Sequence, residues 1–237
     1  MLLDACVTGD LDDVVHPVQL GADVHVRNDK PFRKACEAGH LRVAQWLYSS
    51  GQFVDIFARD CKCFWRACAR GHLAVAQWLV SLGELDLDGL VAQHGLHLAF
   101  WYASAYGHLH VLQWLFALAR YALPQTLHAS FEVSCQYAQL HVAKWLWAVA
   151  ADAVHVHVCV HNHWRTLSVS PKHRPLAWWL LEIESVHAAW PAEGLRALQH
   201  WSGCRDVWMR SVAVVGRPHH GHTAHDPVGH GGPIQFS

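Results

Sequence analysis

Apolar residues and helix-ending glycines recur along the chain in a fixed order. Residues 35–51 read ACEAGHLRVAQWLYSSG, and residues 67–83 read ACARGHLAVAQWLVSLG. The two segments are identical at twelve of seventeen positions and lie 32 residues apart. A period of this length indicates stacked repeats, in which each unit contributes the same supersecondary structure.

Two aromatic columns fix the phase of the repeats. A phenylalanine opens each of four clear copies, and a tryptophan follows it after fourteen residues. The columns are Phe32, Phe64, Phe100 and Phe131, and Trp46, Trp78, Trp114 and Trp145. More divergent copies start at Leu2 and at Trp164, the second with one inserted residue before Trp179. The chain therefore contains about six units.

The pattern within one unit predicts a pair of helices. In the second unit, Phe32, Ala35 and Cys36 have the i, i+3, i+4 spacing of one helix face. Gly39 suits the left-handed end of this first helix, and an apolar second helix follows up to Gly51. Such a pair is too small to bury its own apolar surface, so it requires neighbouring units on both sides.

The repeats predict an all-α repeat solenoid with connecting hairpin turns, degenerate and poorly ordered at both ends. It spans residues 1–190, with units near 2–29, 30–61, 62–97, 98–128, 129–161 and 162–190. A helical cap is expected within 191–215, and a disordered tail over 216–237 because that segment is rich in His, Gly and Pro. In the fifth unit Ala138 and Gln139 replace Gly-His, which predicts a looser turn between the helices.

Composition and charge narrow the classes of function. The chain has 237 residues, is 52% hydrophobic, and carries 18 basic and 19 acidic residues for a net charge of −1. This balance argues against a nucleic-acid partner, which would need a basic face. No apolar run has the length of a membrane span, and no signal pattern is present. We therefore expect an intracellular protein, in the cytoplasm, without a membrane partner.

Cysteine, histidine and tryptophan occupy fixed positions of the repeat. The cysteine column, Cys6, Cys36, Cys68 and Cys135, indicates buried packing of small side chains rather than redox or metal chemistry. The tryptophan column is interpreted as packing between units. The histidine column, His40, His72 and His108, is interpreted as turn packing and backbone hydrogen bonding, with a ladder of metal or proton sites as the alternative.

The motif HVHVCVHNH at residues 155–163 is the strongest metal candidate. On an extended strand its alternate residues would share one side, and zinc accepts imidazole and thiolate together. These residues are His155, His157, Cys159, His161 and His163. The favoured interpretation is a solvent-facing hairpin or loop, because the motif aligns with the connecting turn of other units. Zinc binding through this motif and the His-rich tail is the alternative function.

These motifs together resemble the ankyrin repeat family. GADVHVRND (21–29) is similar to the closing turn of that family, and PFRKACEAGHLRVAQWL (31–47) is similar to its two helices. The pattern F-x-x-A-C-x-x-G-H-L-x-V-A-Q-W-L is similar to ankyrin arrays of large DNA viruses and some protists. The resemblance covers about residues 1–185. It implies a monomeric interaction module or adaptor that binds another protein, a host protein if the viral pattern is a guide.

No phosphate loop, nucleophile elbow or repeated carboxylate pair is present in the sequence, so we expect neither an enzyme nor a cofactor. Family members contact partners through turn tips and the first-helix face, so the resemblance points to variable residues there. The candidate partner-binding residues are His25, Arg27, Asp29, Arg33, Arg59, Asp60, Arg66, Arg70, Trp101 and Tyr102. The alternative for each of them is an ordinary solvated rim.

Overall fold

The computed structural model describes residues 2–50, 56, 58–83, 95–118, 124–183 and 190–199. These ranges hold thirteen α-helices and two 3₁₀ helices, and they contain no strand. None of the described helices is long and apolar enough to cross a bilayer. The segment expected to form a tail, 216–237, lies outside the described residues.

The helices come in pairs that share a short turn. The first helices are α1 (Leu2–Thr8), α3 (Val26–Ala38), α5 (Ala58–Ala69), α8 (Gly95–Tyr106), α10 (Pro124–Gln136) and α12 (Val156–Val169). The second helices are α2 (Leu11–Gln19), α4 (Leu41–Ser49), α6 (Leu73–Ser81), α9 (Leu109–Leu118), α11 (Leu140–Ala150) and α13 (Arg174–Glu182). The remaining elements are η1 (Ala151–Ala153), η2 (Pro171–His173) and α15 (Ala192–Gln199), which contacts α12.

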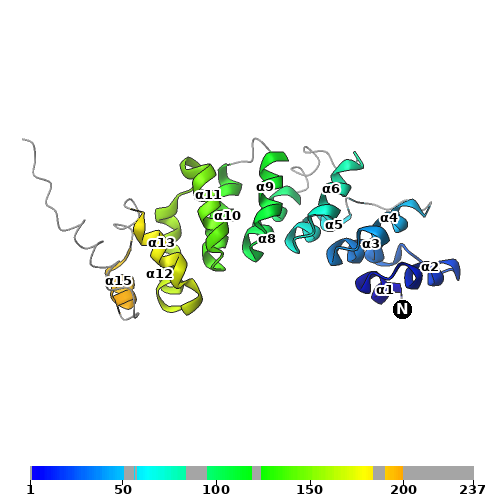
Figure 1. Cartoon of the computed structure of the whole chain (residues 1–237), viewed down its shortest axis with the longest axis horizontal. Coiled ribbons are helices and arrows are strands. Elements are labelled where there is room, and N and C mark those ends of the chain that lie inside the picture. Colours follow the sequence, from blue (N-terminus) through cyan, green and yellow to red (C-terminus); the bar gives the residue numbers. More distant parts are fainter. Residues whose placement is uncertain are drawn as a thin grey trace, which may run out of the picture.

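The pairs stack side by side into an elongated, gently arched molecule (Figure 1). Consecutive first helices contact one another from α1 to α12 and form one layer on the inner side of the arch. The second helices form the outer layer. The inner layer is therefore a continuous surface to which each unit contributes its first helix, and the expected all-α repeat solenoid is confirmed.

Three of the expected unit starts fall inside first helices, whereas the one at 2 coincides with the start of α1 and those at 30 and 62 directly follow left-handed Asp29 and Cys61. Residues 129 and 162, for example, lie within α10 and α12. The repeated aromatic residues set the phase of the pattern, whereas each first helix begins several residues before its aromatic residue.

The phenylalanine column lies in the core between the layers, and the tryptophan column is partly buried against it. The phenylalanine column is at most 1% exposed, and the cysteine column consists of fully buried free thiols. Ring centroids pair across units: Phe32 with Trp78 at 6.3 Å, Phe64 with Trp114 at 6.4 Å, and Phe131 with Trp179 at 6.5 Å. These contacts confirm that the tryptophan column packs between units and that the cysteine column is structural.

The turn between paired helices explains the repeated Gly-His pair. Gly39 ends α3 with a left-handed φ of 85°, and its N–H and that of His40 donate to the carbonyls of Cys36 and Ala35. The ring of His72 in the next unit lies against this glycine. A Cβ atom on Gly39 would be only 2.4 Å from Nδ1 of His72. Backbone conformation and inter-unit packing therefore both require glycine.

Each histidine of this column also hydrogen-bonds the preceding unit. The acceptor is a backbone carbonyl of that unit. It belongs to the residue two places before the turn glycine, or before Ala138 where alanine stands in the place of glycine. The pairs are His40 with Val7 (2.8 Å), His72 with Glu37, His108 with Ala69, and His173 with Gln136 (2.9 Å). The structural interpretation of the histidine column is confirmed, and His173 extends it into the sixth unit.

Acidification is expected to destabilise the stack through these histidines. Burial, with the charges of nearby histidines, lowers the pKa of His72 and His108 below the usual 6.5, and burial lowers that of His173. Below that usual value, an unfolded chain takes up protons that the folded chain does not. The contribution of these histidines to the free energy of unfolding should therefore fall as the pH drops from 7 toward 5, and stay constant above 7.

Urea denaturation at a series of pH values measures this slope. Gln139 already replaces histidine in the fifth unit, so a variant with His72→Gln, His108→Gln and His173→Gln provides the matched control. It should retain most of its stability at pH 7 and show a shallower slope between pH 7 and 5. An unchanged slope would assign the acid sensitivity to other groups.

The fifth unit keeps the same turn without Gly-His. Ala138 adopts a left-handed φ of 62°, and its N–H and that of Gln139 donate to the carbonyls of Cys135 and Ser134. The side-chain amide of Gln139 donates to the carbonyl of Ala105 at 3.0 Å. The expectation of a looser turn is wrong, because an amide N–H can replace the imidazole N–H.

The substitution Ala138→Gly is expected to stabilise the chain by about 1 kcal/mol, because left-handed alanine carries strain that glycine lacks. The greater freedom of glycine in the unfolded state offsets part of the gain. Urea denaturation followed by circular dichroism measures the change. Ala148→Gly on the exposed face of α11 is the control and should lower stability. Equal losses in both variants would contradict strain at Ala138.

Candidate functional site

Four predicted binding residues lie in or beside a left-handed turn at the start of α3. Arg27, Asn28 and Asp29 have φ values of 55°, 59° and 55°. A left-handed residue other than glycine costs about 1–2 kcal/mol, so three in succession require support from their surroundings. Cys61, the equivalent of Asp29 in the third unit, also has a φ of 55°.

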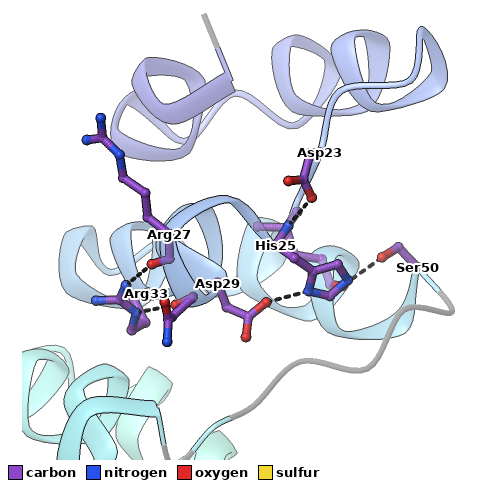
Figure 2. Close-up of polar contacts among 8 residues, drawn as sticks. Asp23, His25, Arg27, Asp29, Arg33 and Ser50 are labelled. Atoms are coloured by element: carbon purple, nitrogen blue, oxygen red, sulfur yellow. Dashed lines mark hydrogen bonds and ion pairs between the residues drawn. The ribbon is translucent and has the colours of Figure 1, made fainter.

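Side chains on both sides of the turn supply that support (Figure 2). Asp23 Oδ1 accepts from the N–H of His25 at 2.8 Å, and His25 Nδ1 lies 2.5 Å from Asp29 Oδ1. Arg33 donates from Nε to the carbonyl of Asn28 at 2.8 Å and from Nη2 to that of Arg27 at 2.7 Å.

Burial separates these residues into two groups. Asp29 and Arg33 are 6% and 8% exposed, so they support the turn and offer little surface to a partner. Arg27 is exposed, and Figure 2 shows its side chain extending away from Arg33. Arg59 and Asp60 lie in α5, but their side chains are outside the described residues.

A single carboxylate joins α3 to α5. Glu37 Oε1 lies 2.6 Å from Arg66 Nη1 and 3.7 Å from Arg70 Nη2, and Glu37 Oε2 lies 3.0 Å from Lys34 Nζ. Burial of Glu37 opposes its ionisation, but the hydrogen bonds and charges of Lys34 and Arg66 outweigh this effect and lower its pKa. Two predicted residues, Arg66 and Arg70, therefore meet at one acidic side chain.

An aromatic patch continues this surface from α5 to α8. The rings of Trp65 and Tyr102 stack at 5.1 Å with 13° between their planes, and Trp101 meets Tyr102 edge-on at 4.8 Å. Tyr106, which is 54% exposed, stacks on Tyr102 at 6.2 Å. The guanidinium carbon of Arg66 lies 5.0 Å from the centroid of the Trp65 ring, which links the charged residues to the aromatic ones.

Sequence reasoning missed three members of this surface: Glu37, Trp65 and Tyr106. The signal for Trp65 was present, because it follows Phe64 as Trp101 follows Phe100. Tyr106 occupies the same position of the repeat as Arg70. Glu37 has no such signal, because its importance comes from cations that the next unit brings to it.

The metal hypothesis assumed an extended conformation at residues 155–163, and the structure instead places them at the start of α12. Residues two apart on a helix point in different directions, and Cys159 is buried while His161 is exposed. His163 Nε2 lies 3.0 Å from Glu132 Oε1, and the side chain of His157 is outside the described residues. No three His, Cys, Asp or Glu side chains form a metal-binding group in the part of the chain that is described.

Comparison with known proteins agrees with this geometry. A family model described as ankyrin repeats (many copies) matches residues 32–80. The crystal structure of the human ASB11 ankyrin repeat domain is similar with a TM-score of 0.55, covering 89% of this chain and 96% of that chain. The fold is that of an ankyrin repeat solenoid. The sequences are only 17% identical, so the similarity shows the fold alone. No curated protein sequence matches the chain.

Proposed function

We propose that this ankyrin repeat chain is a non-catalytic module that binds a partner protein through the inner surface of α5 and α8. The observation that supports this most is the shared patch of Arg66, Arg70, Trp101 and Tyr102 with Trp65. These residues occupy variable positions of the repeat, whereas the repeated ones build the core. Arginine, tryptophan and tyrosine are also the residues that dominate interface energies.

The rigidity of the patch favours binding. Tyr102 is held between the rings of Trp65 and Tyr106, and Glu37 holds Arg66 by a short ion pair. Side chains that are already ordered lose little conformational entropy when a partner binds. The surface therefore offers preorganised aromatic faces and guanidinium groups for recognition.

Affinity capture from cell lysate tests this surface, followed by titration of the captured protein. The variant Arg70→Ala with Tyr106→Ala removes two exposed side chains from the patch, so the fold should persist. We expect affinity for the partner to fall by roughly 30-fold or more, as is typical when interface hot spots are truncated.

The matched control, Arg42→Ala with Tyr137→Ala, removes the same residue types at exposed positions that do not belong to the patch. Arg42 lies on α4, and Tyr137 follows α10 at the same repeat position as Tyr106. The control should bind as the parent chain does. If the patch variant bound the partner with the full affinity of the parent chain, the binding surface would lie elsewhere.

A further inference from the structure

The two inner rings of the aromatic patch offer edges rather than faces to a partner. Tyr102 is stacked between Trp65 and Tyr106, with centroid distances of 5.1 Å and 6.2 Å and 13° between the planes in each pair. The cationic groups of Lys62 and Arg66 also lie over the ring of Trp65. The surface that Trp65 and Tyr102 leave to a partner is therefore mostly ring edge.

Ring edges select the chemistry of the groups that they contact. An aromatic ring is negative on its faces and positive along its edge, so the edge attracts an anion or the face of another aromatic ring. The bases of a single-stranded nucleic acid would instead need free ring faces on which to stack. The patch therefore favours a protein segment that carries acidic and aromatic side chains.

Arg70 supplies a cation at the end of this patch. Its side chain is 62% exposed, and its ionic contact within the described part of the chain is with Glu37 Oε1 at 3.7 Å. That oxygen lies only 2.6 Å from Arg66 Nη1, and Glu37 Oε2 lies 3.0 Å from Lys34 Nζ. Glu37 is thus paired with two nearer cations, and an exposed ion pair at 3.7 Å contributes little to stability. Arg70 can therefore turn toward a carboxylate of a partner with little loss.

Arg70 and Tyr106 occupy equivalent positions of neighbouring units. Each directly precedes its turn glycine, Gly71 or Gly107, and these glycines have φ values of 80° and 81°. The helices α5 and α8 pack side by side (Figure 1), and packed helices lie about 8–10 Å apart. In an extended segment, side chains two residues apart point to the same side at a separation of roughly 7 Å. Two such side chains can therefore reach the guanidinium and the ring together.

We propose that the partner binds through an extended segment in which an aspartate or glutamate lies two residues from an aromatic side chain. This inference rests on the proposed function and specifies the chemistry of the partner. The carboxylate pairs with the guanidinium of Arg70, which can donate two parallel hydrogen bonds to it. The aromatic side chain packs against Tyr106 and turns its face toward the ring edges of the patch.

Nuclear magnetic resonance titration of the ¹⁵N-labelled full chain with a blocked pentapeptide tests the inference. The probe has a central aspartate, a phenylalanine at each end and alanine between them, so it presents the same spacing in either chain direction. We expect saturable shifts of the guanidinium signal of Arg70 and of the indole signals of Trp65 and Trp101. A probe with asparagine for aspartate, or with alanine for both phenylalanines, should bind several-fold more weakly. Unchanged signals at millimolar aspartate peptide would overturn the proposal.

Two variants assign the contacts. Arg70→Gln should weaken the aspartate peptide by about fivefold, as for an exposed ion pair, and should leave the asparagine peptide unaffected. Tyr106→Ala should remove the preference for phenylalanine over alanine in the probe. Arg42→Gln with Tyr137→Ala is the control and should bind as the parent chain does. If Arg70→Gln preferred aspartate over asparagine as strongly as the parent chain, the assignment of the carboxylate to Arg70 would be wrong.

Two further probes test other sources of the same chemistry. The asparagine peptide with a free carboxyl end represents the chain end of a partner. If it bound as tightly as the aspartate peptide, the assignment to an acidic side chain would be overturned. A thymidine decanucleotide that bound more tightly than the aspartate peptide and shifted the same signals would overturn the choice of a protein segment.

Comparison with affinity capture separates this inference from the proposed function. If Arg70→Ala with Tyr106→Ala lost the captured partner while the parent chain did not bind the aspartate peptide, the interaction surface would stand and the acidic–aromatic segment would fall. If that variant kept the partner at full affinity, both the surface and the segment would fall.

Discussion

The substitution Gly39→Ala is expected to lower the free energy of unfolding by about 2–4 kcal/mol. Alanine at φ 85° carries left-handed strain of about 1–2 kcal/mol. Its Cβ would also lie 2.4 Å from Nδ1 of His72, so that ring must move and lose its hydrogen bond to the backbone of Glu37. A hydrogen bond lost in a partly buried place adds about 1–2 kcal/mol. Urea denaturation followed by circular dichroism measures the sum.

Gly83 separates the two contributions because it has a similar φ of 77° and nothing within 4 Å of where its Cβ would be. Gly83→Ala should therefore cost only the strain. His72→Ala removes the ring that Gly39→Ala displaces. The double variant should therefore lose less stability than the sum of the losses in the two single variants. Equal losses for Gly39→Ala and Gly83→Ala would show that the ring adapts without cost.

The repeat pattern predicted the parts of the fold that each unit builds alike. The pair formed by Phe64 and Cys68 recurs with the same spacing in the second, third and fifth units, and that spacing defines a buried helix face whatever the neighbours are. Gly39 was recognised as a helix end for the same reason. The packing of His72 on Gly39 was inferred only in outline, because it joins residues 33 apart through the stacking of two units.

The pattern failed where one unit departs from the others. The motif at 155–163 alternates polar and apolar residues with the period of a strand, yet Val156 and Val160 are buried at helical spacing. Contacts with α10 and α15 decide between the two periods, and both lie outside the motif. Short apolar stretches are ambiguous between helix and strand for this reason.

Arg33 shows the same limit at the candidate site. It stands at a variable, charged position, so the sequence favoured a partner contact. Its guanidinium instead binds two carbonyls of a turn that contains no glycine, and the left-handed conformation of Arg27 has no signal in the sequence. Arg66 and Trp101 also stand at variable positions, and they do lie on the candidate binding surface. Variability of a position therefore does not by itself separate a residue that supports the fold from one that is available to a partner.

The substitution Arg33→Ala is expected to lower the free energy of unfolding by about 3 kcal/mol. Two hydrogen bonds from a charged donor, at 2.8 Å and 2.7 Å, are lost together. Each such bond contributes about 1.5–3 kcal/mol, and water reaching the freed carbonyls of exposed Arg27 and Asn28 offsets part of the loss. The left-handed turn also loses its main support, so the start of α3 should open more often.

Denaturation measures the total, and hydrogen exchange at the N–H of Asp29, which donates to the carbonyl of His25, measures the local opening. Arg42→Ala on the exposed face of α4 is the control and should cost less than 0.5 kcal/mol, as is usual for surface positions. Arg33→Lys keeps the charge but not the two-pronged geometry, so it should remain clearly destabilised. If Arg33→Ala cost no more than Arg42→Ala, the turn would hold without the guanidinium, and Arg33 would again be a candidate for contact with the partner.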